Sequence, residues 1–119
     1  MTVEIRFIGA AGTVTGSKYL LQTDSHQILI DSGLFQGPKE FRERNRLPFK
    51  DYAGIALDKI DCVLLTHAHL DHSGLLPKLF RDGLRVPIFC TEATKALSEY
   101  LLPDAARLQA EDADWRRKK

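Results

Sequence analysis

The stretch LLTHAHLDHSGL constrains this chain more than any other part of its sequence, because His67 to His72 carry the spacing H-x-H-x-D-H. It directly follows Ile60–Leu65, a nearly continuous apolar run typical of a strand buried on both faces. Residues two apart point the same way in extended backbone but to different sides of a helix. The spacing therefore predicts an extended loop in which His67 and His69 converge on one point. Asp71 and His72 are expected at the start of the following helix, directed toward a second point nearby.

Imidazole nitrogens and a carboxylate in this arrangement favour a zinc site, with manganese or iron as possible substitutes. The candidate metal ligands are His67, His69, Asp71 and His72. Two ions about 3.5–4 Å apart can share a hydroxide and act as a hydrolytic centre at neutral pH. A finger-type structural site is excluded because it uses cysteines at wider spacing. The alternative is a turn that is rich in histidine by chance.

The remaining pattern predicts strands first, then strand–helix units, which is an α/β layered arrangement. Strands are expected at Val3–Phe7, 18–23, Ile28–Ile30 and Val86–Cys90. Helices are expected at 39–46, at 75–80 with Pro77 in the first turn, from an N-cap at Thr91, and from Pro103 toward Trp115.

Three other features admit two interpretations each. The loop GAAGTVTG matches neither the dinucleotide nor the P-loop pattern, so it is either a close approach to a ligand or a flexible connection. Asp31, which ends an apolar strand, is either a turn cap or a carboxylate that orients a metal-bound histidine. Arg42, Arg44 and Arg46 either contact phosphate or form a solvated helix face.

Composition sets broad limits. The 119 residues, 44 % of them apolar, fit one small domain or part of a larger one, and the net charge of +1 does not indicate a polyanionic partner. Cys62 and Cys90 lie in or beside apolar runs and are interpreted as buried reduced thiols, with a disulfide or a thiolate ligand as the alternative. No apolar run approaches the roughly 20 residues of a membrane span, and no secretory signal begins the chain, so a cytoplasmic location is expected.

The sequence T-H-A-H-L-D-H-S-G after a buried strand resembles the signature of the metallo-β-lactamase-fold hydrolases. FIGAAGTVTGSKYLL, ILIDSGLFQG and PIFCTEATKAL further resemble the β-CASP RNA-processing nucleases, which are similar to the cleavage and polyadenylation specificity endonuclease. The resemblance implies an αββα sandwich, two zinc ions per complete site and phosphodiester hydrolysis of RNA. It places His67 and His69 on the first zinc and Asp71 and His72 on the second. Asp31 would be the aspartate of the first motif, supporting the metal loop, so that Asp71 and Asp31 are the catalytic candidates.

The family's remaining ligands, two histidines and a metal-bridging aspartate, have no counterpart here, because no histidine follows His72. We therefore expect an N-terminal portion, with residues 1–90 forming half of the metallo-β-lactamase-like domain and residues 91–119 the helical start of a β-CASP-type segment. Zinc binding to this chain is expected to be weak or limited to one ion. The expected partners are RNA and either the missing C-terminal half or a second copy, without a membrane. Two alternatives remain open: hydrolysis of a thioester, lactone or β-lactam, and a non-catalytic remnant or binding module.

Overall fold

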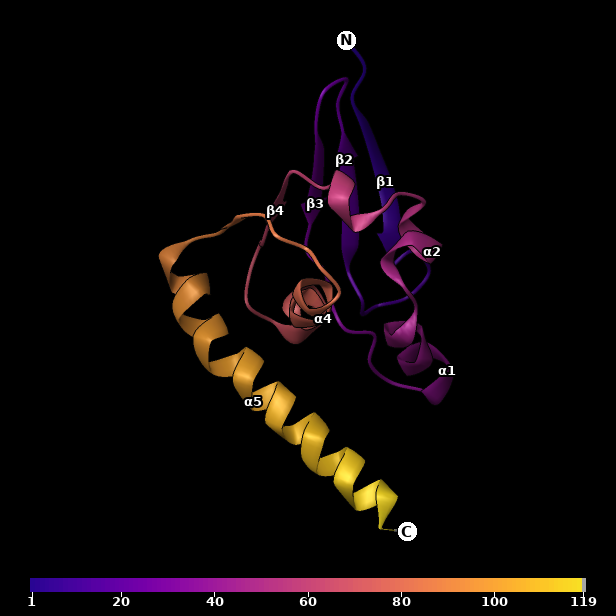
Figure 1. Ribbon diagram of the computed structural model, residues 1–119, viewed down its shortest axis with the longest axis vertical. Coiled ribbons are helices and arrows are strands. Elements are labelled where there is room, and N and C mark those ends of the chain that lie inside the picture. Colours follow the sequence, from indigo (N-terminus) through magenta and orange to yellow (C-terminus); the bar gives the residue numbers. More distant parts are fainter. Residues whose placement is uncertain (119) are drawn as a thin grey trace.

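A mixed sheet organises residues 1–118, the part of the chain that this computed structural model describes. Its strands follow one another in sequence order (Figure 1): β1 (Glu4–Gly9), β2 (Lys18–Gln22), β3 (Gln27–Ile30), β4 (Cys62–Leu64) and β5 (Ile88–Phe89). The strands β1 to β3 are antiparallel neighbours, whereas β4 runs parallel to β3 and β5 runs parallel to β4. The predicted strands are thus confirmed, together with the combination of strands and helices that the pattern indicates.

Helices cover one face of this sheet. Leu20, Leu29 and Val63 lie opposite one another across β2, β3 and β4, and all three are fully buried. Burial of each such side chain stabilises the fold by about 1.5–3 kcal/mol. The helices α2 (Phe49–Ala53) and α4 (Leu76–Arg81) complete the core. Its buried members are Leu20, Leu29, Phe49, Ala53, Ile60, Val63, Leu65, Leu76, Leu79 and Leu84.

The other face of the sheet is open over the described residues. Its apolar side chains form a row across all five strands, namely Phe7, Tyr19, Ile30, Leu64 and Phe89. Phe7 is 68 % exposed and Phe89 is 56 % exposed. The prediction that β4 is buried on both faces is therefore wrong: Val63 is buried, but Leu64 is 36 % exposed because no second sheet lies over it in residues 1–118. Residues 1–118 contain one helix-covered sheet, whereas the αββα sandwich implied by the resemblance has two.

Short helical segments connect the strands. The expected helix at 39–46 is present but changes type, from α1 (Lys39–Arg42) to the 3₁₀ segment η1 (Glu43–Arg46). The segments η2 (Leu57–Lys59) and α3 (Leu70–Ser73) flank β4. The amide of Asn45 in η1 accepts a hydrogen bond from the Phe35 backbone N–H at 2.7 Å and donates one to the Phe35 carbonyl at 2.9 Å. This pair of bonds ties η1 to the loop that follows β3.

The C-terminal helix α5 (Glu92–Arg117) begins as predicted, because the hydroxyl of Thr91 accepts a hydrogen bond from the Thr94 N–H at 3.2 Å. The prediction of a separate helix from Pro103 is wrong, since the helix continues through that proline. Proline removes one backbone hydrogen bond, and the ion pairs of Arg107 with Asp104 and Glu111 support the turns beyond it. Of the side chains described along α5, only that of Thr94 is buried.

The sequence predicted that both cysteines are buried, and this prediction is wrong. Cys62, in β4, is half-buried, and Cys90, directly after β5, is exposed. Both thiols are free, so no disulfide joins them. None of the helices in residues 1–118 is both long enough and apolar enough to span a bilayer.

Candidate metal centre

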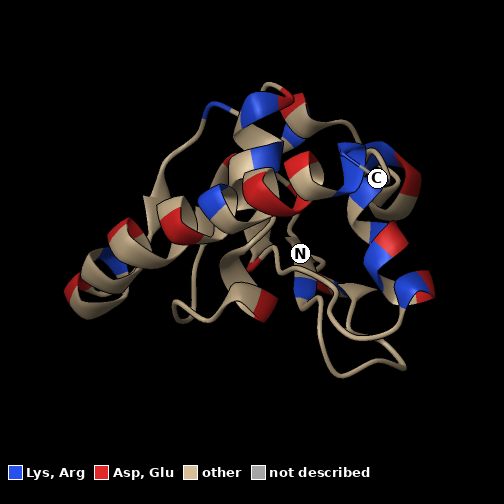
Figure 2. Ribbon diagram, turned by 90° about the horizontal axis from the view of Figure 1, so that it is seen from below, with Lys and Arg blue, Asp and Glu red and all other residues tan. Residues whose placement is uncertain are grey.

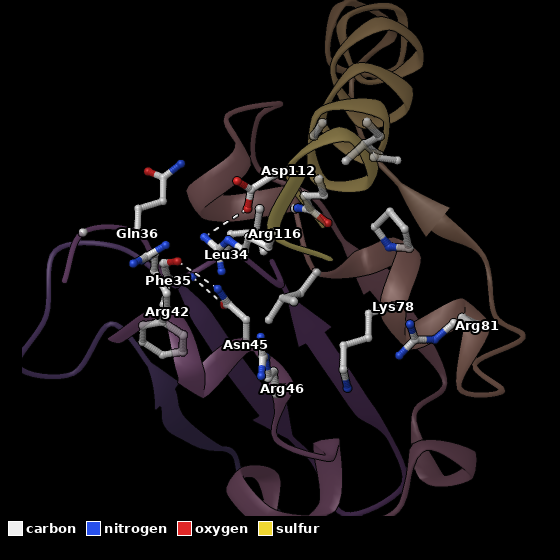
Figure 3. A pocket seen from close by; sticks show the side chains of 18 residues that line it. Leu34, Phe35, Gln36, Arg42, Asn45, Arg46, Lys78, Arg81, Asp112 and Arg116 are labelled. Carbon is white, nitrogen blue, oxygen red and sulfur yellow. Dashed lines mark hydrogen bonds and ion pairs between the residues drawn. The ribbon is translucent and has the colours of Figure 1, made fainter. Parts of the chain in front are cut away.

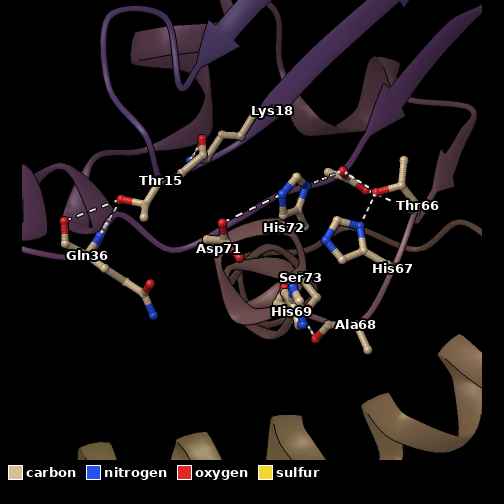
Figure 4. Close-up of polar contacts among 12 residues, drawn as sticks. Thr15, Lys18, Gln36, Thr66, His67, Ala68, His69, Asp71, His72 and Ser73 are labelled. Carbon is tan, nitrogen blue, oxygen red and sulfur yellow. Dashed lines mark hydrogen bonds and ion pairs between the residues drawn. The ribbon is translucent and has the colours of Figure 1, made fainter.

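The histidine stretch lies where β3 and β4 end. These two strands are parallel, so their C-terminal ends meet at one edge of the sheet. Residues 65–69 belong to no helix or strand, and α3 begins directly after His69, as the spacing H-x-H-x-D-H predicts. The loop Asp31–Gly33, which leaves β3, lies against α3. Figure 4 shows how His67 and His72 face the end of β3.

Backbone hydrogen bonds join α3 to two loops. The Ser32 N–H donates to the His72 carbonyl at 2.8 Å, and the Ser17 N–H donates to the Asp71 carbonyl at 3.0 Å. These bonds satisfy carbonyls at the end of a short helix that have no partner within it. Ser17 follows directly after GAAGTVTG, so this loop connects β1 to β2 and also leads to the candidate site. The approach is close: a Cβ on Gly33 would lie 1.7 Å from the Asp71 carbonyl oxygen, which only glycine permits.

Asp31 is the centre of the polar network. It is only 1 % exposed and its φ is +61°, a left-handed conformation that aspartate tolerates better than most residues. Its Oδ1 accepts a hydrogen bond from the Thr66 N–H at 2.8 Å. Its Oδ2 accepts one from the Thr66 hydroxyl at 2.7 Å and lies 2.8 Å from His72 Nδ1. Within residues 1–118, every hydrogen bond to this buried carboxylate thus comes from the histidine stretch.

These contacts determine which nitrogen of each imidazole carries the proton. A carboxylate only accepts hydrogen bonds, so His72 Nδ1 must be the donor to Asp31. The single hydroxyl proton of Thr66 is used on Asp31, so the contact of 2.9 Å between Thr66 Oγ1 and His67 Nδ1 requires the proton on Nδ1. In the neutral form of both histidines the lone pair is therefore on Nε2, which is the atom left to bind a metal.

The four candidate ligands gather at this edge. The ring centroid of His67 lies 4.9 Å from that of His69 and 4.0 Å from that of His72. Asp71 Oδ2 lies 3.6 Å from His72 Nε2. Within residues 1–118, however, no group of three or more His, Cys, Asp or Glu side chains is placed to hold one ion. The donor types and the free Nε2 atoms fit zinc, and the described residues supply part of a coordination sphere.

Comparison with known proteins decides the family. The model of the metallo-beta-lactamase superfamily matches residues 11–110. The chain belongs to this superfamily. Among its relatives, the ribonuclease TTHA0252 of Thermus thermophilus is 50 % identical over 103 residues, which are 87 % of this chain and 22 % of that protein. The transcription termination factor FttA of Cenarchaeum symbiosum is 39 % identical over 106 residues, 89 % of this chain and 16 % of that protein.

Solved structures agree on the fold. The subclass B3 metallo-beta-lactamase BJP-1 of Bradyrhizobium japonicum superposes with a TM-score of 0.56 at 24 % identity, covering 80 % of this chain and 33 % of that one. The chain thus spans about a third of this superfamily structure and about a fifth of the sequence relatives named above.

The sequence pattern did not indicate two residues of the candidate metal centre. Thr66 joins Asp31 to His67, and Gly33 permits the contact with α3. A hydroxyl residue directly before the first histidine was the available signal for Thr66. A glycine two positions after Asp31 was the available signal for Gly33.

Lys18 is a third residue that the pattern did not indicate. Its side chain is 1 % exposed, and its Nζ donates hydrogen bonds to the carbonyls of Gly16 at 3.0 Å and Gly33 at 2.8 Å. The ammonium also lies 4.1 Å from the centroid of the Phe35 ring. Burial lowers the pKa of Lys18 to about 7. Lys18 therefore holds together the two loops that contact α3.

Proposed function

We propose that this chain is the N-terminal, metal-binding portion of a zinc-dependent hydrolase that cleaves the phosphodiester bonds of RNA. The observation that carries the proposal is the bonding of Asp31 to Thr66 and His72, which leaves the Nε2 atoms of His67 and His72 free as metal ligands. The relatives support RNA as the substrate, because one is named a ribonuclease and another a transcription termination factor. The similarity to B3 metallo-beta-lactamases is below 25 % identity and supports the fold alone.

Each candidate residue has a role in this proposal. His67 and His69 hold a first zinc ion, and Asp71 and His72 hold a second. When bound, the pair of ions supplies a hydroxide at neutral pH and stabilises charge on the phosphate. Asp31 holds the His72 ring through Nδ1 and the His67 ring through Thr66, so that both Nε2 atoms keep their lone pairs. Asp71 contributes the one carboxylate of this ligand set.

The proposal includes the arrangement of the longer protein. Residues 1–90 form half of the metallo-beta-lactamase-like domain, and residues 91–119 begin a β-CASP-type segment. A further chain segment or a second copy supplies the remaining ligands. The protein acts on RNA in the cytoplasm. The open apolar face of the sheet, which contains Phe7 and Leu64, supports a covering partner of this kind.

Zinc titration of the chain tests the ligand assignment directly. We expect weak binding by calorimetry, because two protein ligands per ion leave each coordination sphere half filled by water. His67→Ala should lose binding of the first ion, and His72→Ala should lose binding of the second. The matched control is His26→Ala, since His26 is exposed in a turn and bonds only within that turn. Equal loss in the control, or no zinc bound by the unsubstituted chain, would contradict the proposal and favour a non-catalytic remnant.

A further inference from the structure

A groove next to the candidate metal centre concentrates positive charge. Its cavity volume is about 760 Å³, and its walls come from η1 and the end of α1, from α4, and from α5. Five cationic side chains line it, and Asp112 is the one carboxylate among the lining residues: Arg42, Arg46, Lys78, Arg81, Arg116 and Asp112. Figure 3 shows these side chains around the cavity, and in Figure 2 several blue segments lie near the C-terminal end of α5.

This is a local segregation of charge and does not follow from the chain as a whole. The sequence has 17 Lys and Arg residues and 16 Asp and Glu residues, which nearly balance. Five Lys and Arg residues but only one Asp, and no Glu, are among the residues that line the groove. Like charges that gather around one cavity repel one another, and a bound polyanion relieves that repulsion. The composition of the groove therefore favours an anionic ligand over a merely solvated helix face.

The cations differ in how far they are already neutralised. Arg116 pairs with Asp112 at 3.0 Å. Lys78 and Arg81 share Asp82, and the hydrogen bond from Lys78 lowers the pKa of that carboxyl. Arg42 and Arg46, by contrast, have no ion pair or side-chain hydrogen bond among residues 1–118. The guanidinium groups of these two arginines, which are four positions apart, are therefore available to bind an anionic ligand.

The groove also adjoins the candidate metal centre. Leu34 and Leu75 line it, and their backbone N–H groups donate to the carbonyls of Leu70 at 2.9 Å and Ser32 at 2.8 Å. A chain lying in the groove therefore passes next to the loop Asp31–Gly33 and α3. Because the cations come from four helical elements, α1, η1, α4 and α5, a ligand with several phosphates contacts more of them than a single phosphate does.

We propose that this groove binds the phosphate backbone of single-stranded RNA and leads it toward the candidate metal centre. Arg42 and Arg46 contact phosphates directly, since guanidinium groups bind phosphate oxygens in a bidentate manner. The positive charges of Lys78, Arg81 and Arg116 strengthen the electrostatic attraction of the groove for phosphate. The identity of the polyanion as RNA rests on the proposed function, whereas the phosphate contacts rest on the groove alone.

Fluorescence anisotropy with a short labelled oligouridylate tests the groove in EDTA, where no zinc is bound. We expect Arg42→Gln and Arg46→Gln together to weaken binding about tenfold and to lower the salt slope of the affinity by about 1.4, because each phosphate contact on a single strand contributes about 0.7. An uncharged peptide nucleic acid with the same bases should not bind.

Arg44→Gln is the matched control. Arg44 lies between the two groove arginines in the chain, but it lies over the rings of Phe41 at 5.0 Å and Phe35 at 5.6 Å and does not line the groove. The proposal is overturned by unchanged binding in the double variant, by an equal loss in Arg44→Gln, or by tighter binding of a polyglutamate peptide than of RNA. If the unsubstituted chain binds zinc but not RNA, the groove alone is refuted. If it binds RNA but not zinc, the metal centre alone is refuted.

Discussion

Asp31 and His72 are 41 positions apart in the chain, yet Asp31 Oδ2 lies 2.8 Å from His72 Nδ1. The contact joins the end of β3 to α3 and determines the imidazole nitrogen that remains available. The hydroxyl of Thr66 bonds both Asp31 and His67, and so connects the same carboxylate to His67. One buried side chain from the first third of the sequence thereby orients two imidazoles of the histidine stretch.

Replacement of Thr66 by valine tests the hydrogen-bonded connection from Asp31 through Thr66 to His67. Thr66→Val keeps the shape of the side chain but removes the hydroxyl that bonds both Asp31 and His67. We expect zinc affinity to fall by about tenfold or more, as it does when a partner of a metal ligand is removed. Competition with a chromophoric chelator measures the change. Thr2→Val, at the exposed start of the chain, should leave the zinc affinity unaltered. An unaltered zinc affinity in Thr66→Val would refute the role of these hydrogen bonds.

The contact between Gly33 and α3 predicts a steric effect. Gly33→Ala places a methyl group 1.7 Å from the Asp71 carbonyl oxygen, so α3 must move. We expect a loss of about 3 kcal/mol in the free energy of unfolding, measured in urea, together with weaker zinc binding. Gly37→Ala is the control: its φ of +100° costs about 1–2 kcal/mol, but the surrounding space is open and zinc binding should persist. Equal zinc binding in the two variants would argue against a role for this contact.

Local pattern predicted the elements that depend on neighbouring residues. The cap at Thr91, the strand β1 and the start of a helix directly after His69 all follow from short-range geometry. The bonds of Asp31 to Thr66 and His72 join positions far apart in the chain, which no periodicity encodes. The exposure of Leu64 was mispredicted for a related reason: an apolar residue indicates a face that will be covered, but not where the covering segment lies.

Lys18 predicts a specific dependence of stability on pH. Its pKa is lowered from 10.5 to about 7 in the fold, so between these values the unfolded chain binds more protons. Stability should therefore rise with pH over this window, by at most about 1.4 kcal/mol per pH unit, and the dependence should end below pH 7. Urea unfolding of the chain and of Lys18→Met measures the difference. Lys50→Met, at an exposed position in α2, should still show the rise of stability with pH. If the rise also persisted in Lys18→Met, Lys18 would be excluded as its source.

The open sheet face predicts self-association of the isolated chain. Phe7 and Phe89 lie in one apolar row across the sheet and are more than half exposed. Contiguous apolar surface of a few hundred Å² usually marks an interface. Light scattering should show oligomers and a hydrophobic dye should bind, with both signals reduced in Phe7→Lys or Phe89→Lys. Val14→Lys, which is exposed away from the sheet, serves as the control. A strictly monomeric chain at high concentration without dye binding would contradict the prediction.

The last prediction concerns catalysis by the 119-residue chain on its own. We expect no appreciable cleavage of single-stranded RNA, because the described residues bring no three ligand side chains onto one ion. Two ions that share a hydroxide must be held about 3.5–4 Å apart, and a misplacement of about 1 Å can cost about 10²-fold in rate. A longer protein that contains this chain should cleave, and Asp71→Asn should abolish that activity while Asp58→Asn, at an exposed position in η2, retains it. Robust cleavage by the short chain alone, lost in Asp71→Asn, would show instead that the site is completed between two copies.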